Sequence, residues 1–277
     1  MSARTLLTGA PIGADLPGRL HHLERAIELA DGRLDPEVIG YASHVLSKAS
    51  DRLRFGTHHS VVALLGATGS GKSSMTNAIV GVDVATTGVR RPTTSSTLAC
   101  TWGQEDPGRL LDWLEIKNRH QVSDSSNALD GLVLLDVPDH DSIRVEHRLE
   151  MERIAEHADL LMFITDPEKY ADAALHHYLA LLSRHGAVTA VVLNKADTLT
   201  NEQLQSCRTD LARLLLADGV GNATILTASA TTGLGVSELR AVLADLVKDH
   251  ELALARLDAD ATVAASDLAA EVGPPMK

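Results

Sequence analysis

The most constraining feature of this chain is a glycine-rich segment that directly follows an apolar run. Residues 61–65 read Val-Val-Ala-Leu-Leu, and residues 66–73 read Gly-Ala-Thr-Gly-Ser-Gly-Lys-Ser, which is the spacing GxxxxGKS. Glycines at these places let the backbone turn tightly, so that successive N–H groups point at a phosphate at the start of a helix. The segment therefore predicts a strand, a phosphate-binding loop and a helix over 72–80.

Each polar residue type in this loop has an expected task. Lys72 adds a positive charge that bridges the β- and γ-phosphates of a nucleotide, and the Ser73 hydroxyl is a ligand for Mg²⁺. The predicted nucleotide contacts of the loop are Gly66, Thr68, Gly69, Ser70, Gly71, Lys72, Ser73 and Ser74. The loop by itself does not distinguish ATP from GTP.

A second apolar run ends in a motif that selects the base. Residues 190–197 read Ala-Val-Val-Leu-Asn-Lys-Ala-Asp and so contain Asn-Lys-x-Asp. The Asp197 carboxylate can accept hydrogen bonds from guanine N1–H and from the exocyclic amine, whereas adenine has no such donor pair on that edge. We expect Asn194 to brace the purine and the phosphate loop, and the Lys195 stem to cover one face of the ring. This motif disfavours an ATP-dependent kinase.

Together these motifs resemble those of GTPases, and two further segments fit the resemblance. Residues 227–235, Thr-Ala-Ser-Ala-Thr-Thr-Gly-Leu-Gly, are similar to the loop that places a backbone N–H against guanine O6, which implies Ser229 and Ala230 as base contacts. Residues 132–140, Leu-Val-Leu-Leu-Asp-Val-Pro-Asp-His, resemble the Asp-x-x-Gly motif, which implies that Asp136 holds Mg²⁺ through a water molecule.

One departure from the GTPase pattern concerns the glycine of that last motif. Asp139 stands where the family has the glycine that donates its N–H to the γ-phosphate. A side chain and a negative charge beside a triphosphate are expected to lower either γ-phosphate affinity or turnover. The backbone N–H remains, so nucleotide binding is still expected.

Four residues form the predicted catalytic set. Lys72 is expected to absorb charge in the transition state, and His140 stands where translational GTPases carry a histidine that orients the attacking water. The polar loop over 86–97 is switch I by position, and its Pro-Thr-Thr segment resembles the threonine pairs of Era-like and bacterial dynamin-like GTPases. The resemblance implies that Thr94, favoured over Thr93, completes the Mg²⁺ shell together with Ser73 and Asp136. Arg91 matches the arginine that G-protein α subunits supply in cis. The alternatives are a solvent-exposed histidine at 140 and a surface charge at 91.

Composition limits the compartment and the partners. The two cysteines, Cys100 and Cys207, and the lack of an apolar N-terminal leader predict a reduced cytoplasmic compartment. A position at the inner face of the membrane is the alternative. A net charge of −12 makes direct nucleic-acid binding unlikely, because a phosphate backbone needs a basic surface. No stretch approaches the roughly 18 apolar residues of a spanning helix. A protein partner, a homodimer, and peripheral membrane association through a region missing from this chain all stay open.

The alternation of apolar runs predicts an α/β fold of the P-loop NTPase type: a mostly parallel central sheet flanked by helices, with N- and C-terminal helical extensions. Its ligand is expected at the carboxyl ends of the strands. The expected strands lie near 60–65, 97–103, 110–116, 131–136, 159–165, 188–193 and 223–227, and the expected helices near 72–80, 145–157, 171–184, 201–217 and 236–249.

The motifs and strands assign a G domain to residues 58–249. Helical patterns outside it predict a hairpin over 1–57 and a C-terminal helix within 250–277. The flanks are interpreted either as a cap on the G domain or as the base of a dynamin-like stalk. Over roughly 55–250 the chain resembles Era-like and dynamin-related bacterial GTPases. The resemblance implies an Mg²⁺-dependent GTP-hydrolysing switch or mechanochemical protein, slow without a partner. The alternative is a non-hydrolysing GTP-binding interaction module with a degenerate switch II.

Overall fold

The structure is a computed structural model that describes residues 16–30, 34–53, 59–85, 96–124, 127–138, 145–182 and 188–272. It divides into two compact units. We call residues 59–247 the sheet unit, and the described parts of 1–58 and 248–277 the helical unit. The division into domains over 1–57, 58–249 and 250–277 stays a prediction.

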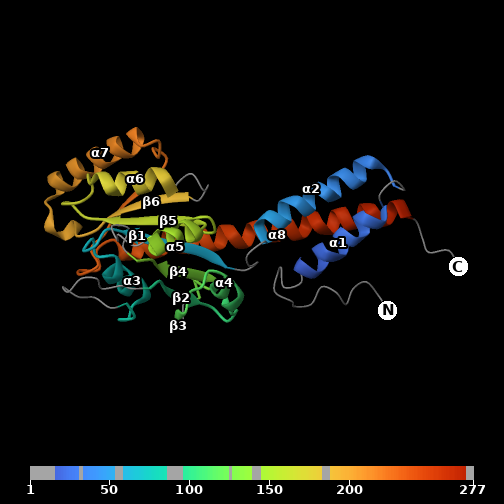
Figure 1. The fold of residues 1–277 in the computed structure, drawn as a ribbon, viewed down its shortest axis with the longest axis horizontal. Coiled ribbons are helices and arrows are strands. Elements are labelled where there is room, and N and C mark those ends of the chain that lie inside the picture. Colours follow the sequence, from blue (N-terminus) through green and yellow to red (C-terminus); the bar gives the residue numbers. More distant parts are fainter. Residues whose placement is uncertain are drawn as a thin grey trace. The chain divides into compact units, whose positions relative to one another are not determined.

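The sheet unit is built on a single sheet whose strands run mostly parallel (Figure 1). Seven strands pair in the described residues, in the order β3-β2-β4-β1-β5-β6-β7, and only β2 and β4 are antiparallel. Their bounds are β1 (Ser60–Gly66), β2 (Leu98–Trp102), β3 (Asn118–Val122), β4 (Leu132–Asp136), β5 (Leu160–Thr165), β6 (Val188–Leu193) and β7 (Thr224–Thr227). The predicted α/β class with a mostly parallel sheet is confirmed.

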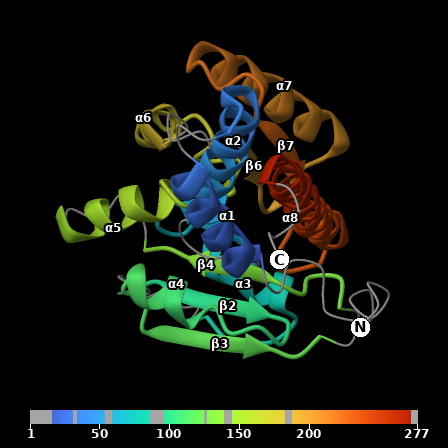
Figure 2. The same cartoon turned by 90° about the vertical axis from the view of Figure 1, so that its right-hand side faces the viewer.

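Helices cover both faces of this sheet. The bounds are α3 (Lys72–Val80), α4 (Gly108–Trp113), α5 (Val145–Ala155), α6 (Ala173–Leu182), η2 (Ala196–Thr198), α7 (Asn201–Ala217) and α8 (Val236–Val272). One core cluster joins alternate residues of the central strands to Met75 and Ile79 of α3 and to Leu239 and Leu243 of α8. Helices α5 and α6 lie on the other side of the sheet from this part of α8 (Figure 2). Buried on both faces, the central strands are continuous apolar runs, as parallel strands require.

The strand predicted over 110–116 is wrong. That segment forms α4, and the neighbouring strand β3 begins only at Asn118. Asp106 Oδ1 accepts the Gly108 N–H at 2.9 Å just before the helix, and the buried Leu110 and Leu114 are four residues apart, which is a helical rather than a strand spacing. Strand β3 reads Asn-Arg-His-Gln-Val on an edge of the sheet and is largely exposed, so it carries no apolar pattern that a sequence search could recognise.

The helical unit consists of α1 (Leu16–Ala30), α2 (Pro36–Leu53) and the C-terminal part of α8. Its core is a cluster formed by Leu20, Leu23, Ala30, Ala42, Val45, Ala261, Ala264 and Leu268. These residues recur at helical spacing because each helix places one apolar stripe inside. Helix α8 extends through Val272, as the pattern beyond Val247 predicts. Within the described residues, none of the helices is both long enough and apolar enough to cross a bilayer.

Candidate nucleotide-binding site

The glycine-rich loop lies where the sequence predicts it, between the end of β1 and the start of α3. Gly71 directly precedes α3 with a left-handed φ of +89°, a conformation that glycine adopts without steric cost. Gly66 pairs with Ile164 of β5, and a Cβ placed on Gly66 would lie 2.6 Å from the Ile164 carbonyl oxygen. Both glycines are therefore required by local geometry, which shapes the loop before any ligand binds.

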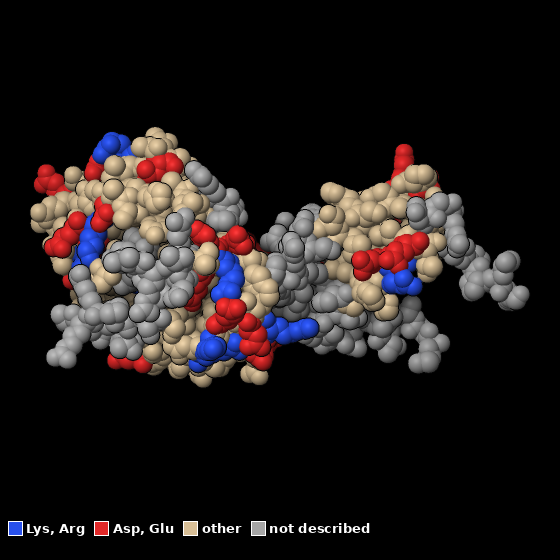
Figure 3. Space-filling view, in the orientation of Figure 1, with Lys and Arg blue, Asp and Glu red and all other residues tan. Residues whose placement is uncertain are grey.

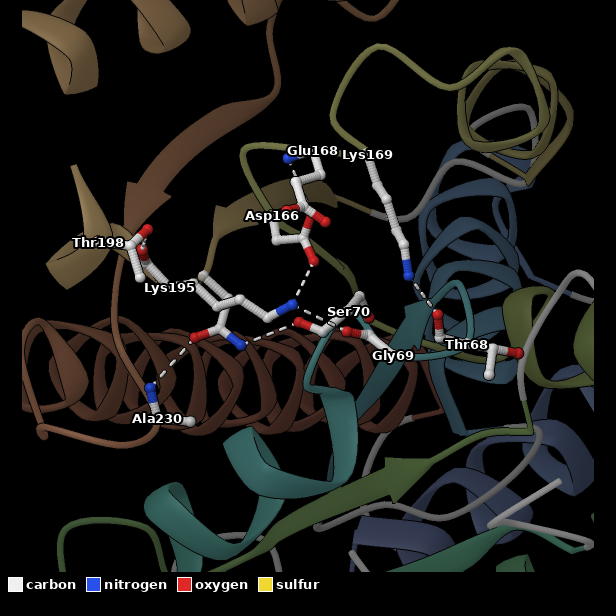
Figure 4. A network of polar contacts seen from close by, with 10 residues as sticks. Thr68, Gly69, Ser70, Asp166, Glu168, Lys169, Lys195, Thr198 and Ala230 are labelled. Atoms are coloured by element: carbon white, nitrogen blue, oxygen red, sulfur yellow. Dashed lines mark hydrogen bonds and ion pairs between the residues drawn. The ribbon is translucent and has the colours of Figure 1, made fainter. Parts of the chain in front are cut away.

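Asn194 connects this loop to the segment after β7. Its Nδ2 donates to the Ser70 carbonyl at 2.9 Å, and its Oδ1 accepts the Ala230 N–H at 3.1 Å (Figure 4). Asn194 is 2% exposed, so its bond to the Ser70 carbonyl is shielded from water. A Cβ on Gly71 would come within 2.3 Å of Asn194 Nδ2, so the absence of a side chain at 71 lets this amide reach the loop. The bond to Ser70 is the expected contact with the phosphate loop, and the contact with the purine stays a prediction.

Lys195 and Asp197 follow on the η2 turn. Lys195 has a left-handed φ of 58°, and its Nζ donates to the Gly69 carbonyl at 3.1 Å and to Asp166 Oδ2 at 2.6 Å. The lysine stem thus lies alongside the phosphate loop. The Asp197 side chain is exposed, which leaves its carboxylate accessible to a ligand.

The segment predicted to contact guanine forms a hydrogen-bonded turn between β7 and α8. The Ser229 N–H donates to the Leu234 carbonyl at 2.8 Å, and the Gly233 N–H donates to the Ser229 carbonyl at 2.9 Å. A cavity of about 470 Å³ adjoins this segment, and its lining includes Ser74 and Ala230. Two predicted nucleotide contacts, separated widely in the chain, therefore border one hollow.

Lys72 and Asp136 form a buried ion pair. Nζ of the lysine lies 2.7 Å from Oδ1 of the aspartate, and the second carboxylate oxygen, Oδ2, is buried with no hydrogen-bond partner among the described residues. The charge of Asp136 also acts on Cys100. Burial first, and this charge second, raise the pKa of the Cys100 thiol to about 12. The predicted phosphate ligand and the predicted metal ligand are thus neighbours at the ends of β1 and β4.

Four residues of the switch predictions lie outside the described residues. These are Arg91, Thr94, Asp139 and His140. Their catalytic and metal-binding assignments therefore stay predictions from sequence.

Two residues near the loop, of which Lys169 contacts it directly and Asp166 contacts it through Lys195, were not predicted as site residues. Asp166 is 0% exposed at the end of β5 and pairs with Lys195, and Lys169 Nζ donates to the Thr68 carbonyl. The available signal was their position, because the segment Asp-Pro-Glu-Lys follows a buried strand next to β1. Carboxyl ends of neighbouring parallel strands meet at one edge of the sheet, where a ligand binds.

A glycine-rich loop, an Asn-Lys-x-Asp motif and a buried aspartate on β4, gathered at the carboxyl edge of a mostly parallel sheet, define a P-loop protein of the guanine-nucleotide-binding class. Residues 57–249 match the elongation factor Tu GTP binding domain family. The chain belongs to this family, in agreement with the resemblance of its motifs to those of GTPases.

Individual relatives agree with this assignment. The chain is 30% identical over 195 residues to GTPase Era of Erythrobacter litoralis (strain HTCC2594), covering 68% of this chain and 56% of the relative. It is 26% identical over 185 residues to GTPase Der of Jannaschia sp. (strain CCS1), covering 66% of this chain and 35% of the relative. The chain thus spans about half or less of the length of these relatives.

A solved structure shares the fold over a longer region. It is that of an oligomerised bacterial dynamin pair, which matches with a TM-score of 0.60 at 14% identity and covers 94% of this chain and 48% of that one. The match extends beyond the sheet unit, so the flanking helices have counterparts in that fold.

Proposed function

We propose that this chain binds GTP together with Mg²⁺, hydrolyses it to GDP and phosphate, and acts as a molecular switch or a mechanochemical protein. The observation that carries the proposal is the buried Asn194 side chain, which bonds the Ser70 carbonyl of the phosphate loop and the Ala230 N–H of the base loop at once. Contact with the guanine base and contact with the phosphates are thereby coupled through one side chain. Asp197 on the same turn provides the carboxylate that reads guanine.

The residues on β4 and α3 suit a magnesium site. Asp136 has a buried carboxylate oxygen without a partner in the described region, and Ser73 lies in the first turn of α3. Hard oxygen donors of this kind are the usual Mg²⁺ ligands, with Thr94 proposed as the third. When bound, Mg²⁺ would supply positive charge to the β- and γ-phosphate oxygens.

For hydrolysis, the protein groups would work by positioning and by electrostatic stabilisation. Lys72 leaves its bond to Asp136 for the phosphates, and the loop amides donate to phosphate oxygens at the start of α3. His140 orients the attacking water in line with the bond that breaks, and Arg91 neutralises charge in the transition state. We keep Lys72, His140, Arg91 and Thr94 as the proposed catalytic set.

A dynamin-like role is supported by the fold match over the flanking helices. That protein oligomerises and is associated with membrane tethering, so we propose that the helical unit of this chain contacts a protein partner, a second copy or a membrane surface. Sedimentation of the purified chain with GTP, with GDP and with anionic vesicles tests this. If the chain stays monomeric and does not bind vesicles in any nucleotide state, only the switch role remains.

We keep nucleic acid out of the proposed partners. The net charge is −12, and on the face drawn in Figure 3 the described Lys and Arg side chains lie beside Asp and Glu. Arg119, for instance, pairs with Asp112, and Arg153 with Glu115. Salt-dependent binding of a structured RNA at physiological ionic strength would contradict this proposal. We place the protein in the cytoplasm or at the inner face of a membrane.

The second candidate is a GTP-binding interaction module that does not hydrolyse, and it is motivated by Asp139. Phosphate release from GTP, with Mg²⁺ and with EDTA, separates the two candidates. Single-turnover rates and nucleotide affinities of Asp139→Gly and His140→Ala then test the switch residues. If Asp139 repels the triphosphate, the glycine variant binds GTP more tightly relative to GDP or turns over faster. A glycine variant that loses hydrolysis refutes repulsion, and full activity of His140→Ala removes that residue from the mechanism.

A further inference from the structure

Three consecutive carbonyl groups of the phosphate loop accept hydrogen bonds from side chains of the neighbouring strand ends. The contacts are Lys169 to Thr68, Lys195 to Gly69 and Asn194 to Ser70 (Figure 4). Two of these donors belong to the Asn-Lys-x-Asp motif. The third, Lys169, belongs to no motif that assigns it a task.

Lys169 acts on a particular peptide group. In a trans peptide the carbonyl and the N–H that follows it point in opposite directions within one plane. A cation that holds the Thr68 carbonyl on the β5 side therefore turns the Gly69 N–H to the opposite side of the loop. Gly69, with a φ of +79°, has much conformational freedom to lose, so the orientation of this peptide needs an external restraint.

The turn that carries Lys169 is itself organised by Asp166. The side-chain carboxylate of Asp166 accepts the Glu168 N–H at 3.0 Å. The backbone carbonyl of Asp166 accepts the Lys169 N–H at 3.0 Å and the Tyr170 N–H at 2.9 Å. The same carboxylate holds Lys195 through Oδ2. One buried aspartate at the end of β5 thus presents two lysines to adjacent carbonyls of the loop.

We propose that Lys169 is a positioning residue for guanine nucleotide, which holds the Thr68–Gly69 peptide in the phosphate-binding orientation and adds a second cation beside the loop. This inference rests on the proposed nucleotide-binding function of the loop. Because Lys169 bonds the protein backbone, it acts through the loop, and its loss leaves the phosphates with a less ordered set of donors.

The test is the dissociation of a fluorescent GDP derivative from the purified full chain, followed by stopped flow. The variants are Lys169→Met, Lys169→Arg and, as a control with the same change of charge, Lys117→Met on an exposed residue before β3. Lys169→Met is expected to release GDP about tenfold faster, since one charge-assisted hydrogen bond is lost. Lys169→Arg, which keeps charge and donors, restores most of the rate, and Lys117→Met releases GDP like the unaltered chain.

Thermal unfolding of each variant without nucleotide distinguishes positioning from a purely structural role. Positioning predicts that Lys169→Met melts near the unaltered chain while its nucleotide affinity falls. If Lys169→Met and the unaltered chain release GDP at the same rate, the inference fails while the proposed function stands. A large drop in the melting temperature of Lys169→Met that Lys169→Arg does not reverse has the same consequence. Absence of GDP binding by the unaltered chain overturns both this inference and the proposed function.

Discussion

Lys72 Nζ lies 2.7 Å from Asp136 Oδ1, and the two side chains are 3% and 0% exposed. Both charges are removed from water, and each is stabilised by the other. In the proposed function, a nucleotide with its metal would compete for both partners, because the phosphates would attract the lysine and the cation would attract the carboxylate. Until then the ion pair keeps both buried charges compensated.

The first prediction concerns the stability of this pair. Lys72→Met leaves a buried carboxylate unpaired and is expected to lower the free energy of unfolding by about 3–5 kcal/mol, as is typical when one partner of a buried pair is removed. The double variant Lys72→Met/Asp136→Leu removes both charges and should be more stable than Lys72→Met. Urea unfolding without nucleotide measures both. Additive losses in the double variant would show that the two charges do not stabilise each other.

The second prediction concerns phosphate affinity. Lys72→Ala is expected to weaken GTP binding by about 1.5–3 kcal/mol, the usual contribution of a charge-assisted hydrogen bond. Titration calorimetry with GTP and GDP measures the loss. Unchanged GTP affinity would mean that nucleotide binds away from the glycine-rich loop.

The third prediction concerns base specificity. The Asp197 carboxylate is exposed on the η2 turn, and Asp197→Asn replaces its acceptor with an amide donor. This variant should prefer xanthine nucleotides over guanine nucleotides, because xanthine has an oxygen where guanine has its amine. Competition of XTP, GTP and ATP for the unaltered chain and the variant tests it. Equal affinity of the unaltered chain for GTP and ATP would remove the guanine assignment.

The fourth prediction compares two glycines that have similar φ angles. Gly71 has a φ of +89° and a Cβ there would lie 2.3 Å from Asn194 Nδ2, whereas Gly219 has a φ of +79° with nothing within 4 Å. Gly219→Ala should cost only the strain of the left-handed conformation, about 1–2 kcal/mol of stability, and leave nucleotide affinity unchanged. Gly71→Ala also displaces the Asn194 amide from the loop, and its GDP affinity should fall by at least about tenfold. Equal affinities in the two variants would exclude Asn194 as the coupling residue.

The fifth prediction separates the two thiols. Because the pKa of Cys100 is raised to about 12, its thiolate is scarce in the folded chain at pH 8, and burial blocks access as well. Iodoacetamide should modify only Cys207 in the native protein and both cysteines in urea, as mass spectrometry can count, with Cys207→Ser as the control. Rapid modification of Cys100 in the native protein would contradict this burial.

The same pKa shift makes stability depend on pH. The unfolded Cys100 thiol ionises near its ordinary pKa of 9.0 while the folded one stays protonated, so stability falls as the pH rises from about 9 towards 12.

The sequence by itself determined the phosphate loop, the base motif and the class of fold, because each depends on a pattern within a short window. Glycines at fixed spacing after an apolar run, and Asn-Lys-x-Asp after another, report local turns and buried strands whatever the rest of the chain does. The same local reasoning failed at 110–116, where an apolar run fits a strand and a helix alike, and the Asp106 carboxylate favours the helix. The polar edge strand β3 showed no pattern to recognise.

Only the tertiary structure decided that Lys169 contacts the loop and that Lys72 pairs with Asp136. Lys169 and Thr68 are 101 residues apart, and Lys72 and Asp136 are 64 apart, so no window of sequence contains either pair. The strand order brings them together: β1 lies between β4 and β5, and the ends of all three strands open on the same edge of the sheet. Sequence therefore specified the chemical groups. Strand pairing, which depends on the burial of apolar faces over the whole sheet, decided which of those groups became neighbours.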